Sequence, residues 1–568
     1  MLSCAVVGCG PAGMAACTAL RQSGLLVTCF DIAPAPGGIW SSNARDVFSS
    51  RGAVSPIYPS MRCVLPKELM CFSDVHFDFT VPQFPHHTAV QHYMLQCASQ
   101  KGVRGLTRFN TKVESARFDP VDRLWKIISV NVLNGDVMEW AFDKVCVCTG
   151  QTQEVRFPAG LRETLESYVR EGGEVHHAAH VKDFRSFRGK RVVVVGDGVS
   201  AYDYCMELKR MGATVTHSTM MRGDAAATAV EAEGGGSDRG GPSLTSSLWK
   251  DAAPQTDARR AKEVSDVRVA TDAATRLATF MARLPWLRND VHAANDAVRK
   301  WLRYRNTRLE SIPTVGLPMG SEGRGIRFHD DPSRRQSTEE VVAEAKARAQ
   351  LRSGRSFPSP SSAAPSGTFM DQVDAVICAT GYTRRYPFLH PDIRRVLEAE
   401  GQPLLTSSDP ADTAAETSSR GAAGRHGLYL GALWTSEPSL AIVGHQKELL
   451  PPFLLFEAQS RFVAYAFTQR LLLPDSAAAM QAKEAELTTE NPLLKDLCNP
   501  DGLGLHSAVY FNVLQQELGV SSRDTYTAKI MQRQRWLLSS TLVCIYHKFR
   551  SMAPLKRKQQ HLLFSNKV

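Results

Sequence analysis

The chain has 568 residues, of which 43% are hydrophobic and 22% charged, and its formal net charge is +10. This length excludes a single simple core and predicts two or three domains, while the basic balance favours anionic ligands without choosing among them. The 13 cysteines are scattered without any C-x-x-C spacing, which excludes a zinc framework, a dithiol redox pair and a disulfide scaffold, and no metal site is predicted.

The N-terminus begins with a strand, a glycine-rich turn, a helix over about 12–23 and a second strand that ends at Asp31. The glycines of "GCGPAG" permit a tight turn, the approach of a pyrophosphate and close packing of helix on strand. The helix N-terminus attracts the phosphate charge. An acid about 20 residues later bonds the ribose of an unphosphorylated adenosine, as in FAD or NAD, and a helix cap is the alternative for it. The predicted contacts are Gly8, Gly10, Pro11, Ala12, Gly13 and Asp31.

The next motif, "PGGIW" at 36–40, has two adjacent glycines that bring the backbone close to a bulky group, or form a simple turn. Two similar apolar strands follow far apart in the chain. They are "FDKVCVCTG" at 142–150 and "VDAVICATGY" at 373–382, and each ends in Thr-Gly.

A second strand, glycine loop, helix and strand occupy about 190–222. The glycine loop lies in "VVVVGDGVSAYD" at 192–203. The predicted loop contacts are Gly196, Gly198, Ser200 and Ala201, where Ala201 replaces the third glycine. The strand that follows leads to Arg222 instead of an acid. An arginine there suits a 2′-phosphate, so the loop is expected to prefer NADP to NAD, with a plain surface arginine as the alternative. Asp197 is unfavourable beside a pyrophosphate unless it points away.

The composition changes over 223–371, where Ala/Gly/acidic and Pro/Ser low-complexity stretches flank an expected helical segment at 268–310. The basic face of that segment is expected to be solvated, and no nucleic-acid partner is predicted. No stretch approaches the roughly 20 apolar residues that span a bilayer. Together with the cysteine pattern, this favours a cytoplasmic location.

Two different dinucleotides on one chain imply hydride transfer from nicotinamide to flavin. Several blocks resemble the flavin-containing monooxygenase family, closest in pattern to its bacterial trimethylamine-oxidising branch. They are "GCGPAG…FD…GGIW", "PKELMCFSD" (66–74), "FDKVCVCTG", "GDGVSAYD", "VDAVICATGYTRRYPFL" (373–389) and "LYLGALWTSEPSLAIVGHQ" with "FEAQSR" (428–461). The resemblance covers most of 1–222 and 370–470.

The resemblance implies an α/β fold with two Rossmann-like domains, the NADPH domain inserted in the FAD domain. The expected parts are 1–150 (FAD domain, first part), 151–222 (NADPH domain), 223–371 (low-complexity and helical insert, part of the NADPH domain), 372–470 (FAD domain, second part) and 471–568 (helical C-terminal extension). The two Thr-Gly strands would be the crossing points. The resemblance adds Gly38, Ile39, Trp40, Gly150, Thr380, Gly381 and Gln446 to the expected cofactor contacts.

The implied reaction is NADPH reduction of FAD, formation of a C4a-hydroperoxyflavin with O₂, and oxygen transfer to the nitrogen or sulfur of a small nucleophile. The family has an Asn facing the flavin where this chain has Val64, or Leu65 if the alignment slips by one. Gln446 matches the family's Gln, and the resemblance makes position 64 and Gln446 the expected catalytic positions. Leu449, Leu450 and Phe453 stand where the trimethylamine branch has aromatic residues, which favours a neutral or bulkier substrate.

Several alternatives stay open. Without the Asn the chain could be an NADPH oxidase that makes H₂O₂, and a Baeyer–Villiger monooxygenase is a variant of the same chemistry. A flavin-bound interaction protein is the non-catalytic alternative. His177 is either a structural or a functional histidine. The oligomeric state is open, a homodimer included.

Overall fold

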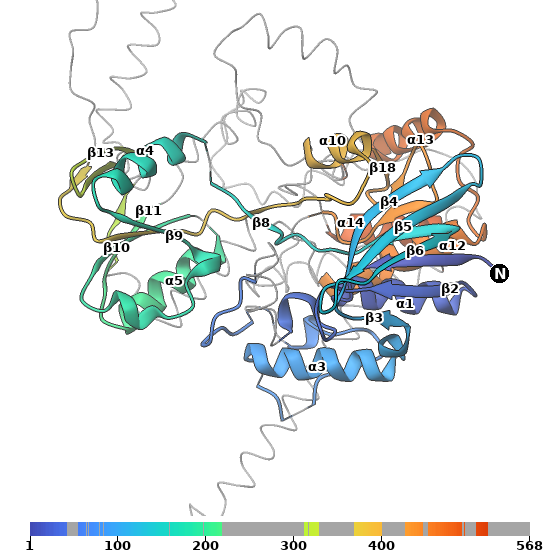
Figure 1. Cartoon of the computed structure of the whole chain (residues 1–568), viewed down its shortest axis with the longest axis horizontal. Coiled ribbons are helices and arrows are strands. Elements are labelled where there is room, and N and C mark those ends of the chain that lie inside the picture. Colours follow the sequence, from blue (N-terminus) through green and yellow to red (C-terminus); the bar gives the residue numbers. More distant parts are fainter. Residues whose placement is uncertain are drawn as a thin grey trace, which may run out of the picture.

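The computed structural model consists of two α/β units joined by a narrow connection (Figure 1). It describes residues 1–41, 55–218, 312–328, 368–399, 427–446, 452–490, 494 and 507–520, apart from positions 64, 66, 79, 83, 158, 197 and 316. The predicted arrangement of two Rossmann-like units, the second inserted in the first, is confirmed. The expected helix at 268–310 lies outside these residues.

The first unit is built on a seven-stranded sheet in the order β18-β19-β20-β7-β1-β2-β3. Strands β20, β7, β1, β2 and β3 run parallel, so their carboxyl ends share one edge. The strands are β1 (Ser3–Val7), β2 (Leu26–Phe30), β3 (Thr107–Arg108), β7 (Lys144–Val147), β18 (Leu428–Tyr429), β19 (Leu433–Trp434) and β20 (Leu440–Ile442), with a separate antiparallel sheet of β4 (Thr111–Asp119), β5 (Leu124–Asn131) and β6 (Val137–Phe142).

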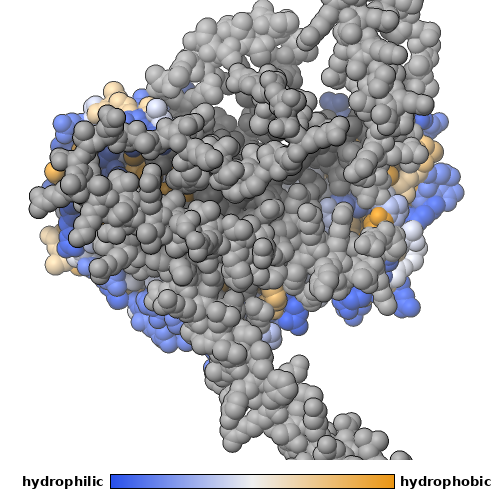
Figure 2. Space-filling model, turned by 180° about the vertical axis from the view of Figure 1, so that it is seen from behind, coloured by the Kyte–Doolittle hydropathy of each residue, from blue (hydrophilic) through white to orange (hydrophobic). Residues whose placement is uncertain are grey.

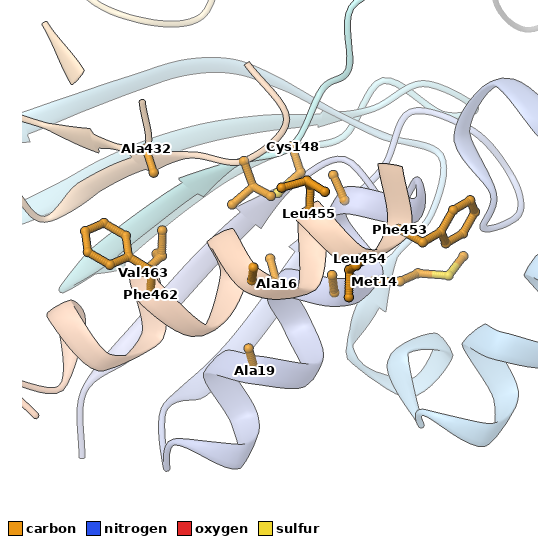
Figure 3. Close-up of a cluster of buried hydrophobic side chains, with 14 of the residues drawn as sticks. Met14, Ala16, Ala19, Cys148, Ala432, Phe453, Leu454, Leu455, Phe462 and Val463 are labelled. Carbon is orange, nitrogen blue, oxygen red and sulfur yellow. The ribbon is translucent and has the colours of Figure 1, made fainter. Parts of the chain in front are cut away.

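Helices α1 and α12 cover one face of this sheet and pack on each other. Met14, Ala16 and Ala19 of α1 belong to the same buried cluster as Leu454, Leu455 and Phe462 of α12, in which Leu455 lies beside Cys148 (Figure 3). The small residues of α1 let the two helices approach closely, and Pro11 at its first position fixes a helical φ. The helices of this unit are α1 (Pro11–Gln22), η1 (Gly38–Trp40), η2 (Lys67–Leu69), α3 (His87–Gln100), η3 (Val103–Leu106), α10 (Pro391–Ala399), α12 (Pro452–Phe467), α13 (Ala477–Glu490) and α14 (Ser507–Glu517).

The second unit holds a five-stranded parallel sheet in the order β12-β11-β10-β16-β9. The run of four valines at 192–195 is buried on both faces, as expected for a central parallel strand. Its elements are α4 (Ala159–Arg170), β9 (Glu174–His177), η4 (Ala178–His180), η5 (Phe184–Phe187), β10 (Arg191–Val195), α5 (Val199–Arg210), β11 (Thr214–Ser218), β12 (Thr314–Val315), β16 (Ala375–Cys378) and an antiparallel sheet of β13 (Pro318–Glu322), β14 (Gly325–Phe328) and β15 (Thr368–Met370).

The connection between the units is the antiparallel pair β8 (Glu154–Val155) and β17 (Tyr382–Thr383), which lies between the two units in Figure 1. Each strand directly follows one of the two Thr-Gly turns. The expected boundary at 372 is too early, because β16 pairs with β10 and β9 and so belongs to the second sheet. The prediction for the insert at 223–371 named no strands, but β12 to β15 lie in its described residues, and β12 pairs with β11 of the second sheet.

A segment of the first unit, residues 55–60, packs into the second unit. Tyr58 is buried edge-on between the rings of Phe184 and Tyr204, and its hydroxyl donates to Asp203 Oδ2 of α5 at 2.5 Å. Ser60 donates to Glu207 Oε2, one turn further along α5, at 2.7 Å. The segment thereby ties the helix that follows the second glycine loop to the part of the chain that leads to position 64.

The described surface seen in Figure 2 is largely hydrophilic, with small separate hydrophobic spots. The most exposed large hydrophobic side chains include Val121, Leu133 and Leu472, which lie in three different loops, and exposed hydrophobic side chains are ordinary on a protein surface. Among the helices that the structure describes, none is long and apolar enough to cross a bilayer.

Candidate dinucleotide-binding sites

The first glycine loop is shaped by two glycines that have no room for a side chain. Gly8 has φ +104°, and a Cβ on it would clash with the carbonyl oxygen of Cys148 at the end of β7. A Cβ on Gly13 would overlap the carbonyl oxygen of Gly8. Gly8 therefore makes the turn and Gly13 lets α1 approach the strand, as the sequence predicts.

The N-terminus of α1 is open to an anion. Gly10 is the N-cap, no side chain caps the helix, and its first turn carries no acid. The unbonded N–H groups and the helix dipole therefore face the loop without a competing carboxylate.

The "PGGIW" segment lies directly against this loop. The Gly37 amide donates to the carbonyl of Cys9 at 3.0 Å, and a Cβ on Gly38 would lie 3.1 Å from the Cα of Gly10. The bulky partner that its glycines approach in this structure is thus the first loop itself. Ile39 and the half-buried Trp40 follow in the same 3₁₀ turn, beside the loop.

Asp31 closes the other side of the loop at the carboxyl end of β2. Its Oδ2 accepts from the Cys9 amide at 2.5 Å and its Oδ1 from the Ala33 amide at 2.7 Å. Burial raises the pKa of Asp31 to about 6, against the opposing effect of these two amides. The side chain is bonded to the loop, and no helix starts beside it, which disfavours the helix-cap alternative.

Three loops meet at the carboxyl edge of the first sheet: 8–13 after β1, 149–151 after β7 and 443–446 after β20. In open parallel sheets ligands bind at this edge. Gly150 has φ +79° and a Cβ there would meet nothing within 4 Å. Gln151, which sequence reasoning missed, donates through Nε2 to the carbonyls of Gly444 at 2.9 Å and Gln446 at 2.5 Å, and so ties two of the loops together.

The side chain of Gln446, expected to act on the cofactor, is instead turned into the protein. It is 1% exposed, its Nε2 donates to the Gly431 carbonyl at 2.7 Å, and its Oε1 accepts from Gln459 at 2.8 Å. Both ends of the amide are bonded inside the protein, so the side chain supports the loop and is not a catalytic group. A family position cannot reveal this, because the orientation depends on partners 13 and 15 residues away.

The second glycine loop repeats the first turn. Gly196 has φ +144°, and a Cβ on it would overlap the carbonyl oxygen of Ala379 at the end of β16. Gly198 is the N-cap of α5, again with no side-chain cap and no acid in the first turn. Ala201 is fully buried and Ser200 is exposed. Asp197 lies outside the described residues.

The carboxyl edge of the second sheet also carries the Thr380–Gly381 turn, which is held by a histidine. Thr380 donates to the carbonyl of Arg156, and His177, at the end of β9, lies with its Nε2 3.1 Å from the Gly381 carbonyl. Its Nδ1 accepts from the Ala179 amide, so the proton is on Nε2. Burial lowers the pKa of His177 to about 4. These contacts fit the structural alternative for His177.

Some expected site residues cannot be placed. Val64, Arg222, Leu449 and Leu450 lie outside the described residues, and Leu65 is buried. The expectation for Phe453 is wrong: it is 1% exposed and packs edge-on against Phe72 with ring centroids 4.9 Å apart. It is part of the core between α12, α3 and the segment that holds Phe72, and it does not line a substrate site.

The described residues contain no group of His, Cys, Asp or Glu that could hold a metal ion. The 11 described cysteines are all buried and unpaired by disulfides. Burial contributes to a raised thiol pKa at Cys9, in the first loop, and at Cys148, at the end of β7, which makes both poor nucleophiles.

Comparison with known proteins shows which proteins the chain is similar to. Residues 2–234 match the family model described as flavin-binding monooxygenase-like. Over this part the chain is similar to flavin-binding monooxygenases. Among curated relatives, it is 27% identical over 397 residues to the human putative dimethylaniline monooxygenase [N-oxide-forming] 6, and 26% identical over 395 residues to flavin-containing monooxygenase 3 of Oryctolagus cuniculus. The matches cover 69% and 68% of this chain and 63% and 64% of the relatives' lengths, so the chain matches less than two thirds of either relative.

Two solved structures share the fold of this chain. Tmm from Pelagibacter sp. strain HTCC7211 superposes with a TM-score of 0.55 at 18% identity, covering 90% of this chain and 86% of Tmm. S-allyl-L-cysteine S-oxygenase from Allium sativum gives a TM-score of 0.57 at 18% identity, covering 97% and 94%. At this level of identity the likeness concerns the fold alone.

Proposed function

We propose that the chain is an NADPH- and O₂-dependent FAD monooxygenase that oxygenates the nitrogen or sulfur of a small nucleophilic substrate. One observation carries the proposal: two glycine loops of the same construction lie at the carboxyl edges of two parallel sheets of one chain. The match of 2–234 to the flavin-binding monooxygenase-like family model supports this class of reaction.

The first site fits FAD. Its loop excludes Cβ atoms at Gly8 and Gly13, its helix N-terminus lacks a competing cap, and Asp31 lies beside the loop where an adenosine ribose would be bonded. The second site fits the phosphates of NADPH in the same way, with Arg222 proposed to bind the 2′-phosphate. When bound, FAD would take up hydride from NADPH and supply the oxygen chemistry.

The chain's own residues then have positioning tasks. Asp31 would orient the adenosine end of FAD, while Gly150, Thr380, Gly381 and the 443–446 loop would rim the dinucleotides. Neither a paired carboxylate dyad nor a nucleophile is needed, because substrate placement and water exclusion suffice for oxygen transfer to an amine or sulfide. A neutral substrate, or one bulkier than a methylamine, remains our proposal on Leu449 and Leu450 alone.

A second candidate activity, NADPH oxidation that releases H₂O₂, is favoured by one sequence observation. Val64 stands where the family has an Asn that faces the flavin, and a valine cannot donate a hydrogen bond. A Baeyer–Villiger oxidation uses the same cofactors and is tested together with it.

The decisive experiment reduces the full-length protein with NADPH without oxygen, mixes it with oxygenated buffer and follows flavin absorbance by stopped flow. A transient spectrum unlike the oxidised and reduced flavin, together with product formed in proportion to NADPH consumed, is expected. Direct return to oxidised flavin with stoichiometric H₂O₂ would favour the oxidase. Absence of NADPH reduction would reject both activities and leave a flavin-bound interaction protein. Efficient conversion of trimethylamine to its N-oxide would contradict the substrate proposal.

A further inference from the structure

A buried chain of hydrogen bonds connects the C-terminal helix α14 to the loop after β20. Tyr510 of α14 is fully buried; its hydroxyl donates to the carbonyl of Leu430 at 2.9 Å and accepts from Gln459 Nε2 at 2.8 Å. Gln459 is also fully buried. Its Nε2 donates a second hydrogen bond to Gln446 Oε1 at 2.8 Å, and its Oε1 accepts from the Gly444 amide at 3.0 Å.

The 443–446 loop, where these hydrogen bonds end, forms a wall of the first dinucleotide site. A Cβ on Gly444 would lie 3.7 Å from the Cβ of Ala12, in the first turn of α1. Gln151 holds the carbonyls of Gly444 and Gln446 from the opposite side. The loop is thus fixed from β7 on one side and from α12 and α14 on the other.

The network has little freedom to rearrange. A Cβ on Gly431 would overlap the amide of Gln446, so the glutamine side chain fills the space beside that turn. Of the two Gln459 Nε2 hydrogens, one is fixed by Gln446 and the other by Tyr510. Loss of the Tyr510 hydroxyl would leave a buried N–H of Gln459 and the Leu430 carbonyl each short of a partner, which destabilises the Gln459 amide in the orientation that bonds Gly444 and Gln446.

We propose that Tyr510 is a positioning residue for the FAD site, acting through Gln459 on the 443–446 loop, so that the C-terminal extension completes this site. The inference rests on the proposed function, because it assumes that the first site takes FAD. It goes beyond the family match, since α14 lies far outside residues 2–234.

The test replaces Tyr510 with Phe in the full-length chain and measures the Kd of FAD for the flavin-stripped protein by fluorescence. We expect the Kd to rise about tenfold, equivalent to about 1.4 kcal/mol, with a shifted visible spectrum of the bound flavin and an unchanged KM for NADPH. Tyr168→Phe is the matched control. Tyr168 is likewise fully buried, and its hydroxyl donates to a backbone carbonyl, that of Val373 at 2.7 Å, but in the second unit.

An unchanged Kd in the Tyr510 variant, or an equal rise in the Tyr168 control, would overturn the inference. If the variant fails to fold, hydrogen–deuterium exchange of the unaltered protein decides. FAD is expected to protect amides of 507–517 as well as those of 440–446, and protection of the second set alone would also overturn it. A protein that binds no FAD would instead refute the proposed function.

Discussion

The two glycine loops are alike at their first glycine and differ at the third position of the motif, where the helix packs against the loop. In both, the first glycine has a positive φ and presses against the last carbonyl of a neighbouring parallel strand, that of Cys148 or Ala379. In the first loop the third position must be glycine, because a Cβ at Gly13 would overlap Gly8, whereas the second loop buries the methyl group of Ala201 there. The two helices therefore stand at different distances from their loops.

The loops also differ in what supports them. "PGGIW" and Asp31 hold the first loop from both sides, and the 443–446 loop adds a third wall. Around the second loop, the described residues offer the His217 ring, whose Nε2 lies 2.8 Å from the Gly196 carbonyl. This contrast suits a first ligand that stays bound and a second that exchanges during turnover.

The largest effect is expected from Gly13→Ala. The added methyl group has no space between α1 and Gly8, so the protein should lose FAD or fail to fold, at a cost of several kcal/mol. Flavin content and thermal unfolding of the purified variant measure this. The matched change Ala201→Gly should keep FAD and NADPH binding and cost about 1 kcal/mol, the usual helix penalty of glycine. Retention of normal FAD by the Gly13 variant would remove the distinction between the loops.

Arg222→Ala addresses the specificity of the second loop. We expect the KM for NADPH to rise about 10- to 100-fold, because a charge-assisted contact to phosphate is lost, while the KM for NADH changes little. Steady-state NAD(P)H oxidation measures both. Equal changes for the two nucleotides would remove the proposed phosphate contact.

The acid of the first loop predicts a pH dependence of FAD affinity. The pKa of Asp31 is raised to about 6 in the free protein, and ribose hydroxyls would favour the ionised form in the complex. Affinity should therefore rise with pH up to about 6 and stay flat above it, falling up to tenfold at pH 5. FAD titrations of the flavin-stripped protein between pH 5 and 8 test this. The Asp31→Asn variant should bind more weakly and lose the dependence; an unchanged slope would contradict the assignment.

The smallest effect concerns His177 in the second unit. The pKa of His177 in the folded protein, about 4, lies below the ordinary value of 6.5. Its contribution to the free energy of unfolding is therefore complete above pH 6.5 and declines as the pH falls from 6.5 toward 4. Between pH 7.5 and 5.5 this amounts to about 1 kcal/mol of unfolding free energy. In denaturant titrations, the free energy of unfolding of His177→Asn should change less between these two pH values than that of the unaltered protein, by this amount. His180→Asn is the control, since that exposed histidine nearby also has a lowered pKa; the same change in both variants would exclude a specific effect of His177.

Local sequence determined much of this protein. The glycine spacing, the runs of valine and the acid at position 31 sufficed to predict two Rossmann-like units and the shape of both loops, because a positive φ, a tight turn and a buried parallel strand each restrict the residue type at a known position. The same local signals mark Asp31 as a residue of the first loop.

Only the tertiary structure decided how distant segments support the sites. Gln446 matches a family position, yet its side chain is held by Gln459 and Gly431 and points into the protein. Phe453 belongs to the core, and β16 joins the second sheet because it pairs with β10, 180 residues earlier in the chain. Tyr510 reaches the first unit from a helix that no local motif marks. Hydrogen bonds and packing between residues far apart in sequence depend on the folded arrangement of the chain, and spacing alone does not encode them.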